Sequence, residues 1–352
     1  MKIAYILSSL DSKAPIFVAK LLAEFFVGQG NEVAVFYFDD ICKVAFPCGT
    51  RRINWGDKIP FDEFDIIHSH MRRPDLYLAK NARNIRRAKI VSTVHCDIKN
   101  DLAISYGRLV SAVFSRQWIR ALKKFDATVQ INDFLMKVYA QFKNNALIYN
   151  EVKIDLHETE RHREICEKML AFKSAGLKTI CSFSVIVKRK GLMQILRLLE
   201  KDECFAYVCI GSGDYRAELE RFVSERKLQS RVAFFDAVER PYVVLKKADI
   251  FCFPSYSEGF SLALLESGLV GASVVCSDIP AFRTFSENEI SFFALDDIGS
   301  LQKACETAIE KRDAKIAALK RRIEQDFSQE KMLLEYQALY KDLTKEHTED
   351  AK

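Results

Sequence analysis

Short apolar runs of strand length alternate with longer amphipathic segments through the first 150 residues. The first run is KIAYIL at 2–7, and residues 14–30 follow it with helical spacing and end at glycines. Further strands are expected at 31–38, 64–70, 89–95 and 127–132, with helices at 74–87 and 102–124. This alternation of strands and helices predicts a parallel, doubly wound α/β sheet.

The alternation pauses at 151–176, where the sequence is charged and partly helical, and then begins again. The second series has expected strands at 178–185, 204–211, 231–235, 249–255 and 273–277, and expected helices at 191–201, 215–228, 241–248 and 261–271. The tail over 301–344 has helical spacing without a further strand. A second α/β unit of similar size is therefore predicted.

A chain of 352 residues is long enough for two domains of about 150 residues each. We expect an N-terminal domain over 1–155, a C-terminal domain over 156–325 and a terminal helix over 326–344. In open parallel sheets, ligands bind beyond the carboxyl ends of the strands. The loops that directly follow the strands are therefore the places where functional residues are expected.

The chain has a net charge of +5, and its basic excess lies in the first half. Residues 1–150 contain 22 Lys and Arg against 14 Asp and Glu, which favours an anionic partner for this half. Residues 106–125 place basic side chains among Leu, Val, Phe and Trp, so they form either an amphipathic helix on an anionic membrane face or an ordinary covering helix. Nucleic acid is a poorer fit, because no nucleic-acid-binding module surrounds these residues.

The apolar runs are all too short to cross a membrane, which takes about 18 or more consecutive apolar residues. Residues 1–17 resemble a first strand rather than a signal peptide. The ten cysteines form no C-x-x-C pair and are expected to be reduced. We therefore expect a cytoplasmic protein, with a peripheral position on the inner face of the cytoplasmic membrane as its possible site of action.

The segment PSYSEGFSLALLESGLVGASVV at 254–275 joins an apolar strand to a helix through a tight turn. Gly259 allows the turn, and Ser261 is a candidate N-cap of the helix. The unpaired backbone N–H groups at a helix start form an anion site. Here these groups belong to Phe260, Ser261, Leu262 and Ala263.

Two glutamates flank this expected anion site. Glu258 lies before the turn, and Glu266 lies on the helix about five residues beyond its start, or roughly 7 Å along the axis. Carboxylates repel phosphate but accept hydrogen bonds from hydroxyl groups. The spacing therefore predicts a diphosphate at the helix start, with a ribose on one side and a sugar on the other.

The same segment resembles the signature of the family-four retaining glycosyltransferases (glycosyl transferases group 1), which adopt the GT-B architecture. That signature is Pro-Ser, then E-G-F-G/S-L, with a second Glu eight positions after the first. Weaker matches follow the family's order at 64–70, 92–98, 147–155, 188–196, 209–220, 231–238 and 327–340. The resemblance implies two Rossmann-like domains facing a cleft, with a terminal helix that crosses back to the first domain.

The resemblance also implies roles for individual residues. Glu266 would bind the ribose of a nucleotide sugar, and Glu258 would contact hydroxyls of the transferred sugar. The amides of 260–262 would hold the phosphates, Lys190 would contact the diphosphate, and the segment ending at Val238 would meet the base. Negative charge grows on a nucleoside diphosphate as it leaves, so a fixed cation and helix amides would stabilise it.

Two stretches depart from the family's pattern. A Gly-Arg pair often precedes the diphosphate-contacting Lys, but Ser184 and Val185 stand near that position here. Arg189 is the candidate for the second cation, although a KRK run also suits a solvated loop. The first loop lacks the family's paired glycines, and Ser12 and Lys13 stand there as candidate acceptor-side residues.

Two further loop residues are candidates. His95 ends the expected strand 89–95, where a histidine is commonly structural, and the resemblance implies contact with the sugar. Gly211 lies in the Gly-rich turn CIGSG and is expected to line the cleft. His68 and His70 alternate on one strand without a third ligand, and no Asp-x-Asp follows a strand, so we expect no metal.

The chain is therefore predicted to be a retaining, metal-independent glycosyltransferase. It would move a hexose or N-acetylhexosamine from a nucleotide sugar, specifically a UDP-sugar, to a growing surface glycan or glycolipid such as lipopolysaccharide core, O-antigen or capsule. No cofactor is expected, because the nucleotide sugar is a substrate. A sugar-nucleotide epimerase or hydrolase on the same fold, and a non-catalytic sugar-nucleotide-binding subunit, are open alternatives.

Overall fold

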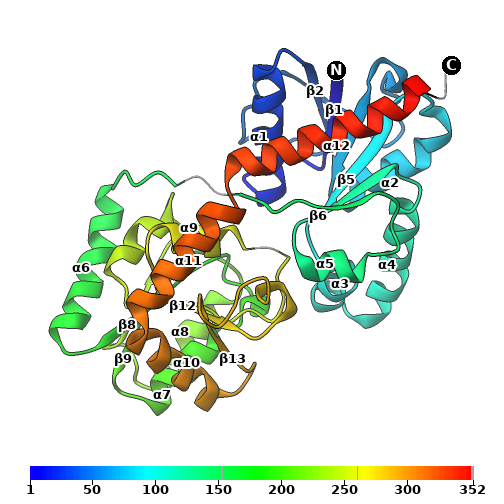
Figure 1. Ribbon diagram of the computed structural model, residues 1–352. Helices are drawn as coiled ribbons and strands as arrows, with labels where there is room; N and C mark the ends of the chain where they lie inside the picture. Colours follow the sequence, from blue (N-terminus) through cyan, green and yellow to red (C-terminus); the bar gives the residue numbers. More distant parts are fainter. Residues whose placement is uncertain (152–153, 260, 350–352) are drawn as a thin grey trace. The chain divides into compact units, whose positions relative to one another are not determined.

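The computed structural model describes residues 1–151, 154–259 and 261–349, and its chain divides into two compact units (Figure 1). The first unit contains residues 1–150 and the C-terminal segment from Gln329, and the second unit is Glu151–Ser328. Each unit has one parallel sheet with helices around it. The predicted pair of doubly wound α/β units is confirmed.

The first unit has a seven-stranded sheet in the order β3–β2–β1–β4–β5–β6–β7. Its strands are β1 (Lys2–Leu7), β2 (Glu32–Tyr37), β3 (Gly49–Arg52), β4 (Ile66–His70), β5 (Lys89–Val94), β6 (Ala127–Gln130) and β7 (Asn145–Leu147). Its helices are α1 (Ala14–Gly28), α2 (Arg72–Asn81), α3 (Ile98–Tyr106), α4 (Arg108–Leu122), α5 (Asp133–Val138) and α12 (Gln329–Glu349). The strand order reverses between β1 and β4, so the loops after these strands lie at the topological switch point.

The second unit repeats this arrangement with six strands in the order β10–β9–β8–β11–β12–β13. Its strands are β8 (Lys178–Phe183), β9 (Phe205–Ile210), β10 (Val232–Phe235), β11 (Ile250–Phe253), β12 (Val274–Ser277) and β13 (Ser291–Phe293). Its helices are α6 (Glu160–Ser174), α7 (Met193–Lys201), α8 (Arg216–Glu225), α9 (Leu262–Leu269), α10 (Ile298–Glu310) and α11 (Arg312–Asp326). Its switch point lies between β8 and β11, and the loops after these two strands carry most of the candidate residues.

Some elements differ from the expectations for local reasons. The strands β3, β7 and β13 were not expected, since β3 reads GTRR without an apolar side chain and the other two span three residues each. The helix expected over 102–124 is two helices, because Gly107 between them has a positive φ of 86°. The helix expected at 241–248 is a 3₁₀ helix, Pro241–Lys247.

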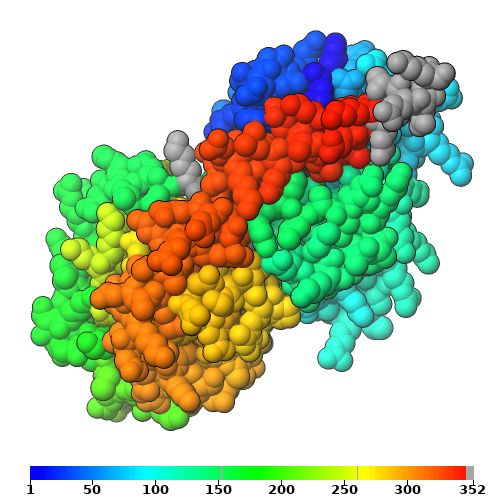
Figure 2. All heavy atoms as spheres, in the orientation of Figure 1, coloured from blue at the N-terminus to red at the C-terminus, as the bar shows by residue number. Residues whose placement is uncertain are grey.

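The C-terminal helix α12 belongs to the core of the first unit. Its buried side chains pack with β1 and α1, and the ring of Tyr340 stacks on Phe26 with 5.0 Å between centroids. In the space-filling view, α12 lies directly against the segment of α1 (Figure 2). The last helix of the chain therefore completes the hydrophobic core of the first unit. The members of α12 in this core are Met332, Leu333, Tyr336, Tyr340 and Leu343.

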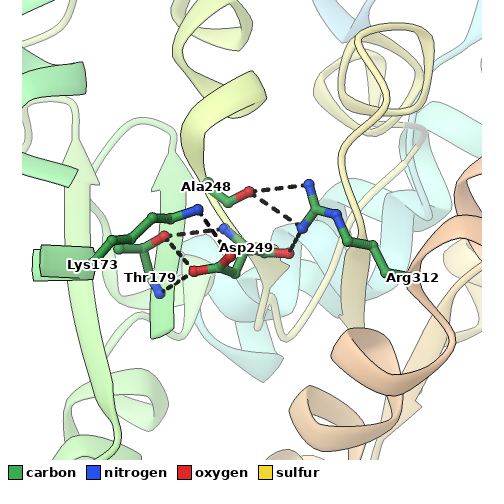
Figure 3. Close-up of polar contacts among 5 residues, drawn as sticks. All are labelled: Lys173, Thr179, Ala248, Asp249 and Arg312. Atoms are coloured by element: carbon green, nitrogen blue, oxygen red, sulfur yellow. Dashed lines mark hydrogen bonds and ion pairs between the residues drawn. The ribbon is translucent and has the colours of Figure 1, made fainter. Parts of the chain in front are cut away.

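A polar cluster fixes the start of β11 in the second unit (Figure 3). The carboxylate of Asp249 accepts hydrogen bonds from Lys173 Nζ at 2.9 Å and from Thr179 N–H at 2.8 Å. The guanidinium of Arg312 donates to the backbone oxygens of Ala248 and Asp249, at 3.4 and 2.6 Å from Nη1. These contacts tie β11 to β8, α6 and α11, at the end of the strands opposite to the candidate site.

A buried carboxylate has a similar role in the first unit. Asp75 on α2 is fully buried and accepts hydrogen bonds from Ser69 Oγ at 2.6 Å, Ser92 Oγ at 2.8 Å and Trp118 Nε1 at 2.6 Å. Burial raises the pKa of Asp75 to about 6, although all three donors favour the ionised form. The carboxylate thus connects α2 and α4 to β4 and β5 beneath the histidine-bearing strand ends.

Candidate functional site

The loops that follow β8 and β11 are in direct backbone contact. Gly191 has a positive φ of 66°, and a Cβ at this position would lie 1.9 Å from the backbone oxygen of Pro254. Gln194 Nε2 donates to the same oxygen at 2.8 Å, and the Tyr256 N–H donates to Arg189 O at 2.9 Å. Only glycine fits at 191, and the two loops hold one another in place.

Glu258 lies on the second of these loops, and its carboxylate is buried beside two cations. Lys190 Nζ lies 2.6 Å from Oε1, and Arg189 Nη1 lies 3.6 Å from Oε2. Ser255 Oγ donates to Oε1 at 2.7 Å, and Arg189 also donates to the backbone oxygen of Ser257. Burial opposes ionisation of Glu258, but the two charges and the hydrogen bonds outweigh it and hold its pKa below the usual value.

Helix α9 begins directly after this loop. Ser261 occupies the N-cap position as expected, but its side chain makes no capping hydrogen bond. Within the described residues, the backbone N–H groups of Leu262 and Ala263 have no acceptor. The start of α9 therefore presents the free amides of an anion site. Gly259 precedes it, while the predicted contribution of Phe260 lies outside the described residues.

Glu266 lies on the less buried face of α9. The opposite face packs into the unit, where a Cβ on Gly268 would meet the side chains of Ile323 and Leu319 on α11. No side chain of the described ranges donates to the Glu266 carboxylate, and burial raises its pKa to about 7. Its surroundings include the buried Tyr242, whose pKa is raised by burial and, in smaller part, by Glu266. This carboxylate is thus positioned to accept hydrogen bonds from a ligand.

Gly211 lies where the loop after β9 touches the loop after β8. Its φ is 145°, and an added Cβ would lie 1.9 Å from the backbone oxygen of Ser184. The Ile186 N–H donates to Ser212 O at 2.9 Å, which continues this contact. The close approach of Ser184 thus explains the glycine at 211 without any contact to a ligand. Val185, which lies between the two backbone contacts, is exposed.

The loop after β10, which contains the half-buried Val238, is held by a histidine that the sequence did not single out. His162 Nδ1 accepts a hydrogen bond from the Thr159 N–H at 3.0 Å, and Nε2 donates to Glu239 O at 2.8 Å. The buried imidazole thus caps α6 and fixes this loop at once. A His at the N3 position of a helix was the available signal, but its partner 77 residues away was not visible in the sequence.

His95 follows β5 in the first unit and is half-buried. Its Nε2 lies 2.9 Å from Nδ1 of His70, and burial lowers the pKa of His95 to about 3. His68 binds Tyr340 and Thr93 instead of facing His95. Among the described residues, no group of three or more metal-ligating side chains is present.

Ser12 and Lys13 lie in the loop after β1 and are exposed. Asp11 is the residue that the other polar groups of this loop contact. Its carboxylate lies 3.3 Å from Lys13 Nζ and 2.9 Å from Lys43 Nζ, and it accepts a hydrogen bond from the Ser12 N–H at 2.9 Å. The two lysines hold the pKa of Asp11 at about 2, with Lys43 the stronger partner. Lys13 therefore has an anionic neighbour that reduces its availability for another anion.

Part of the chain matches a known protein family, and the chain is similar in sequence to known proteins. Residues 171–325 match the family model described as glycosyl transferases group 1. The chain is 29% identical to the O-antigen biosynthesis glycosyltransferase WclY of Escherichia coli over 98% of this chain and 99% of the relative. It is also 30% identical, over 51% of this chain and 48% of the relative, to the N-acetylgalactosamine-N,N'-diacetylbacillosaminyl-diphospho-undecaprenol 4-alpha-N-acetylgalactosaminyltransferase of Campylobacter jejuni.

Solved structures share the fold of the chain. Anabaena HepE in complex with UDP matches with a TM-score of 0.81 and 16% identity, over 97% of this chain and 100% of that chain. WaaG, described as a glycosyltransferase involved in lipopolysaccharide biosynthesis, matches with a TM-score of 0.65 and 14% identity, over 92% of this chain and 95% of that chain. At these identities the likeness concerns the fold.

The contact between Gly191 and Pro254 can be tested against a second glycine of the same unit. Gly176 also has a positive φ, of 81°, but a Cβ there would meet nothing within 4 Å. We expect Gly176→Ala to cost about 1 kcal/mol, the usual strain of a left-handed residue. Gly191→Ala should cost about 1–3 kcal/mol more, because its Cβ also meets the backbone of the β11 loop.

Urea denaturation of the two variants, followed by circular dichroism, measures this difference. Equal destabilisation by the two substitutions would show that the close approach at Gly191 does not constrain the loops.

Proposed function

Because residues 171–325 match the group 1 glycosyltransferases and the chain has the two-domain GT-B fold, we propose that it belongs to this family and transfers a sugar from a nucleotide sugar to a growing surface glycan. The donor is a UDP-sugar that carries a hexose or N-acetylhexosamine, and transfer proceeds with retention of the anomeric configuration. The observation that carries this proposal is the placement of Glu258, Lys190 and Arg189 beside the free N-terminus of α9.

Positive charge at this place suits a leaving diphosphate. Lys190 and Arg189 supply two fixed cations, and the amides of Leu262 and Ala263 add hydrogen-bond donors. Such groups stabilise the charge that develops as the sugar–oxygen bond breaks, and they need no reorganisation during the reaction. We therefore infer that transfer is independent of metal, since these cations do the work that a divalent ion does in other sugar transferases.

The two glutamates suit the neutral parts of the donor. Glu266 lies about one turn along α9 from the amides of Leu262 and Ala263. No side chain of the described residues donates to its carboxylate, which can therefore accept both ribose hydroxyls. Glu258 lies before the helix start and can accept hydroxyls of the transferred sugar. The loop with Val238 would meet the base, and the UDP complex of Anabaena HepE supports the choice of uridine.

Transfer from a donor panel tests the proposed reaction. We expect the purified protein to transfer a sugar from a UDP-sugar to a glycolipid acceptor extract, at a rate that stays within about twofold in excess EDTA because Lys190 and Arg189 provide the positive charge. Radiolabelled product on the acceptor is the readout. Conversion of the donor without acceptor would identify an epimerase or hydrolase, and tight UDP binding without turnover would identify a non-catalytic subunit.

The ribose assignment is tested at Glu266. We expect Glu266→Ala to weaken UDP binding about ten- to a hundredfold, because hydrogen bonds to a charged acceptor contribute about 1.5–3 kcal/mol. Isothermal titration calorimetry measures this, with Glu203→Ala, an exposed carboxylate of the same unit, as the control.

The pKa of Glu266, about 7, also predicts how UDP affinity depends on pH. The ionised form accepts both ribose hydroxyls, so affinity should fall as the pH drops below 7, and Glu266→Gln should remove that component. Unchanged UDP affinity in Glu266→Ala would contradict the ribose assignment.

We further propose that residues 106–125 contact an anionic membrane, where a lipid-linked acceptor would be found. The described helices include none that is both apolar and long enough to span a bilayer. The α3–α4 hairpin instead exposes large apolar side chains, with Leu109 86% and Val113 64% exposed one turn apart. Basic side chains lie on the same helix or just after it, at Arg108, Arg116, Arg120, Lys123 and Lys124.

Vesicle flotation tests this contact. We expect binding to phosphatidylglycerol-containing vesicles and at least about tenfold weaker binding by the double variant Leu109→Gln with Val113→Gln, because the apolar contribution is lost while the charge is kept. Leu170→Gln, at an exposed leucine of α6, is the matched control. Equal binding by all three proteins would exclude the hairpin as the membrane contact.

A further inference from the structure

Three histidines lie in a row at the carboxyl ends of two neighbouring strands in the first unit. The ring centroids of His68 and His70 on β4 are 4.4 Å apart, and those of His70 and His95 are 5.2 Å apart. His68 is fully hydrogen-bonded, with Nδ1 2.6 Å from Tyr340 OH and Nε2 2.9 Å from Thr93 Oγ1. Of these neighbouring histidines, His70 forms the hydrogen bond with His95.

His70 is completely buried and uses one ring nitrogen. Its Nδ1 lies 2.9 Å from His95 Nε2, and its Nε2 is buried without a partner in the part of the chain that the structure describes. The remaining nitrogen of His95, Nδ1, has no partner among these residues either, but it is not sealed from solvent. The pair therefore has one inner end that is closed and one outer end that is open.

One proton lies between His70 Nδ1 and His95 Nε2. The ring that carries this proton determines whether the outer Nδ1 of His95 is a hydrogen-bond donor or an acceptor. If His95 donated to His70, the proton of His70 would lie on Nε2, as a buried N–H without an acceptor. If His70 donates, its Nε2 keeps only a lone pair. Among backbone groups in proteins, a buried N–H without an acceptor is rarer than a buried oxygen without a donor. The arrangement in which His70 donates is therefore favoured.

We propose that His70 is a positioning residue that donates Nδ1–H to His95 and so holds the proton of His95 on its outer Nδ1. This inference rests on the proposed function and on the sugar contact that the family resemblance implies for His95, and it deepens that role. The outer nitrogen is then a hydrogen-bond donor, which suits a sugar hydroxyl or a phosphate oxygen. Without His70, nothing in the strand ends would select this tautomer.

The surroundings keep both rings neutral. Tyr5 on β1 and His68 on β4 lie against the ring of His70, while Tyr336 and Tyr340 on α12 contact His68. No carboxylate of the described residues bonds to the ring of His70 or of His95. Burial lowers the pKa of His70 and His95, and the charges of the neighbouring histidines lower that of His70 further. Protonation of His95 would also set two N–H groups against each other.

The tautomer itself can be measured on the unmodified protein. We expect long-range ¹H–¹⁵N correlation spectra at pH 7.5 to show His95 protonated at Nδ1 and bare at Nε2, and His70 also protonated at Nδ1. The chain has six histidines, so single substitutions suffice to assign the signals. A proton on Nε2 of His95 would overturn the proposal, whether or not the protein is active.

Variants then separate positioning from stability. We expect His70→Leu to shift His95 toward the Nε2–H tautomer and to lower kcat about ten- to a hundredfold, the range found when the partner of a metal-ligating histidine is removed. UDP affinity should stay within about twofold, because the proposed UDP ligands belong to the second unit. His70→Asn keeps an N–H near the lost Nδ1 and should recover most of the rate and the tautomer.

His68→Leu is the matched control, since it removes a buried histidine of the same strand that makes no hydrogen bond to His95. It should leave the tautomer of His95 unchanged. An equal tautomer shift in the two leucine variants, or none in His70→Leu, would refute the positioning role. The expected tautomer together with no transferase activity in the unmodified protein would instead count against the proposed function alone.

Discussion

The donor side of the site depends on the close contact between the β8 and β11 loops at Gly191 and Pro254. This contact brings Lys190 and Glu258, 68 residues apart in sequence, to within 2.6 Å of one another. A buried carboxylate is stable only with a partner, and removal of one member of a buried ion pair costs about 3–5 kcal/mol. Lys190 therefore cannot leave Glu258 unless other groups replace it. In the proposed donor complex, sugar hydroxyls facing Glu258 and a diphosphate facing Lys190 would supply those replacement groups.

In the second unit, the stabilising contacts and the candidate chemistry lie at opposite ends of β11. Asp249 and Arg312 fasten the amino end of this strand to three elements, α6, β8 and α11. The carboxyl end of the same strand carries the loop with Glu258 and leads into α9. In the first unit, the anchoring differs, because Asp75 binds Ser69 directly before His70, at the carboxyl end of β4, and Ser92 within β5. The loop with Glu258 is thus a short extension of a strand that is fixed at its other end, which limits how far its charged groups can move.

The sequence predicted what depends on local spacing. Glu258 and Glu266 are set by a strand, a turn and a helix, and the apolar periodicity of these elements is strong. The sequence did not reveal His162 or Gln194, because each acts through a distant partner that the fold supplies. The expected Ser261 cap failed in one respect, since the residue is at the N-cap but its hydroxyl makes no capping bond. The edge strand β3 could not be predicted, because GTRR has no apolar residue. Its pairing with β2 is what makes this segment a strand.

The C-terminal helix shows most clearly why a site cannot be read from neighbouring residues. Tyr340 reaches His68 across 272 positions of sequence, and Tyr336 reaches Thr93 across 243. Tyr340 and Thr93 occupy both ring nitrogens of His68, so it has no hydrogen bond to offer His70. His70 is left with His95 as its only polar partner among the described residues. The family resemblance places the terminal helix on the first domain, but only the fold shows that its Tyr340 occupies a nitrogen of His68 and so helps to decide which histidine contacts His95. Each imidazole has two ring nitrogens. Because both nitrogens of His68 already have partners, the hydrogen bond of His70 is directed to His95.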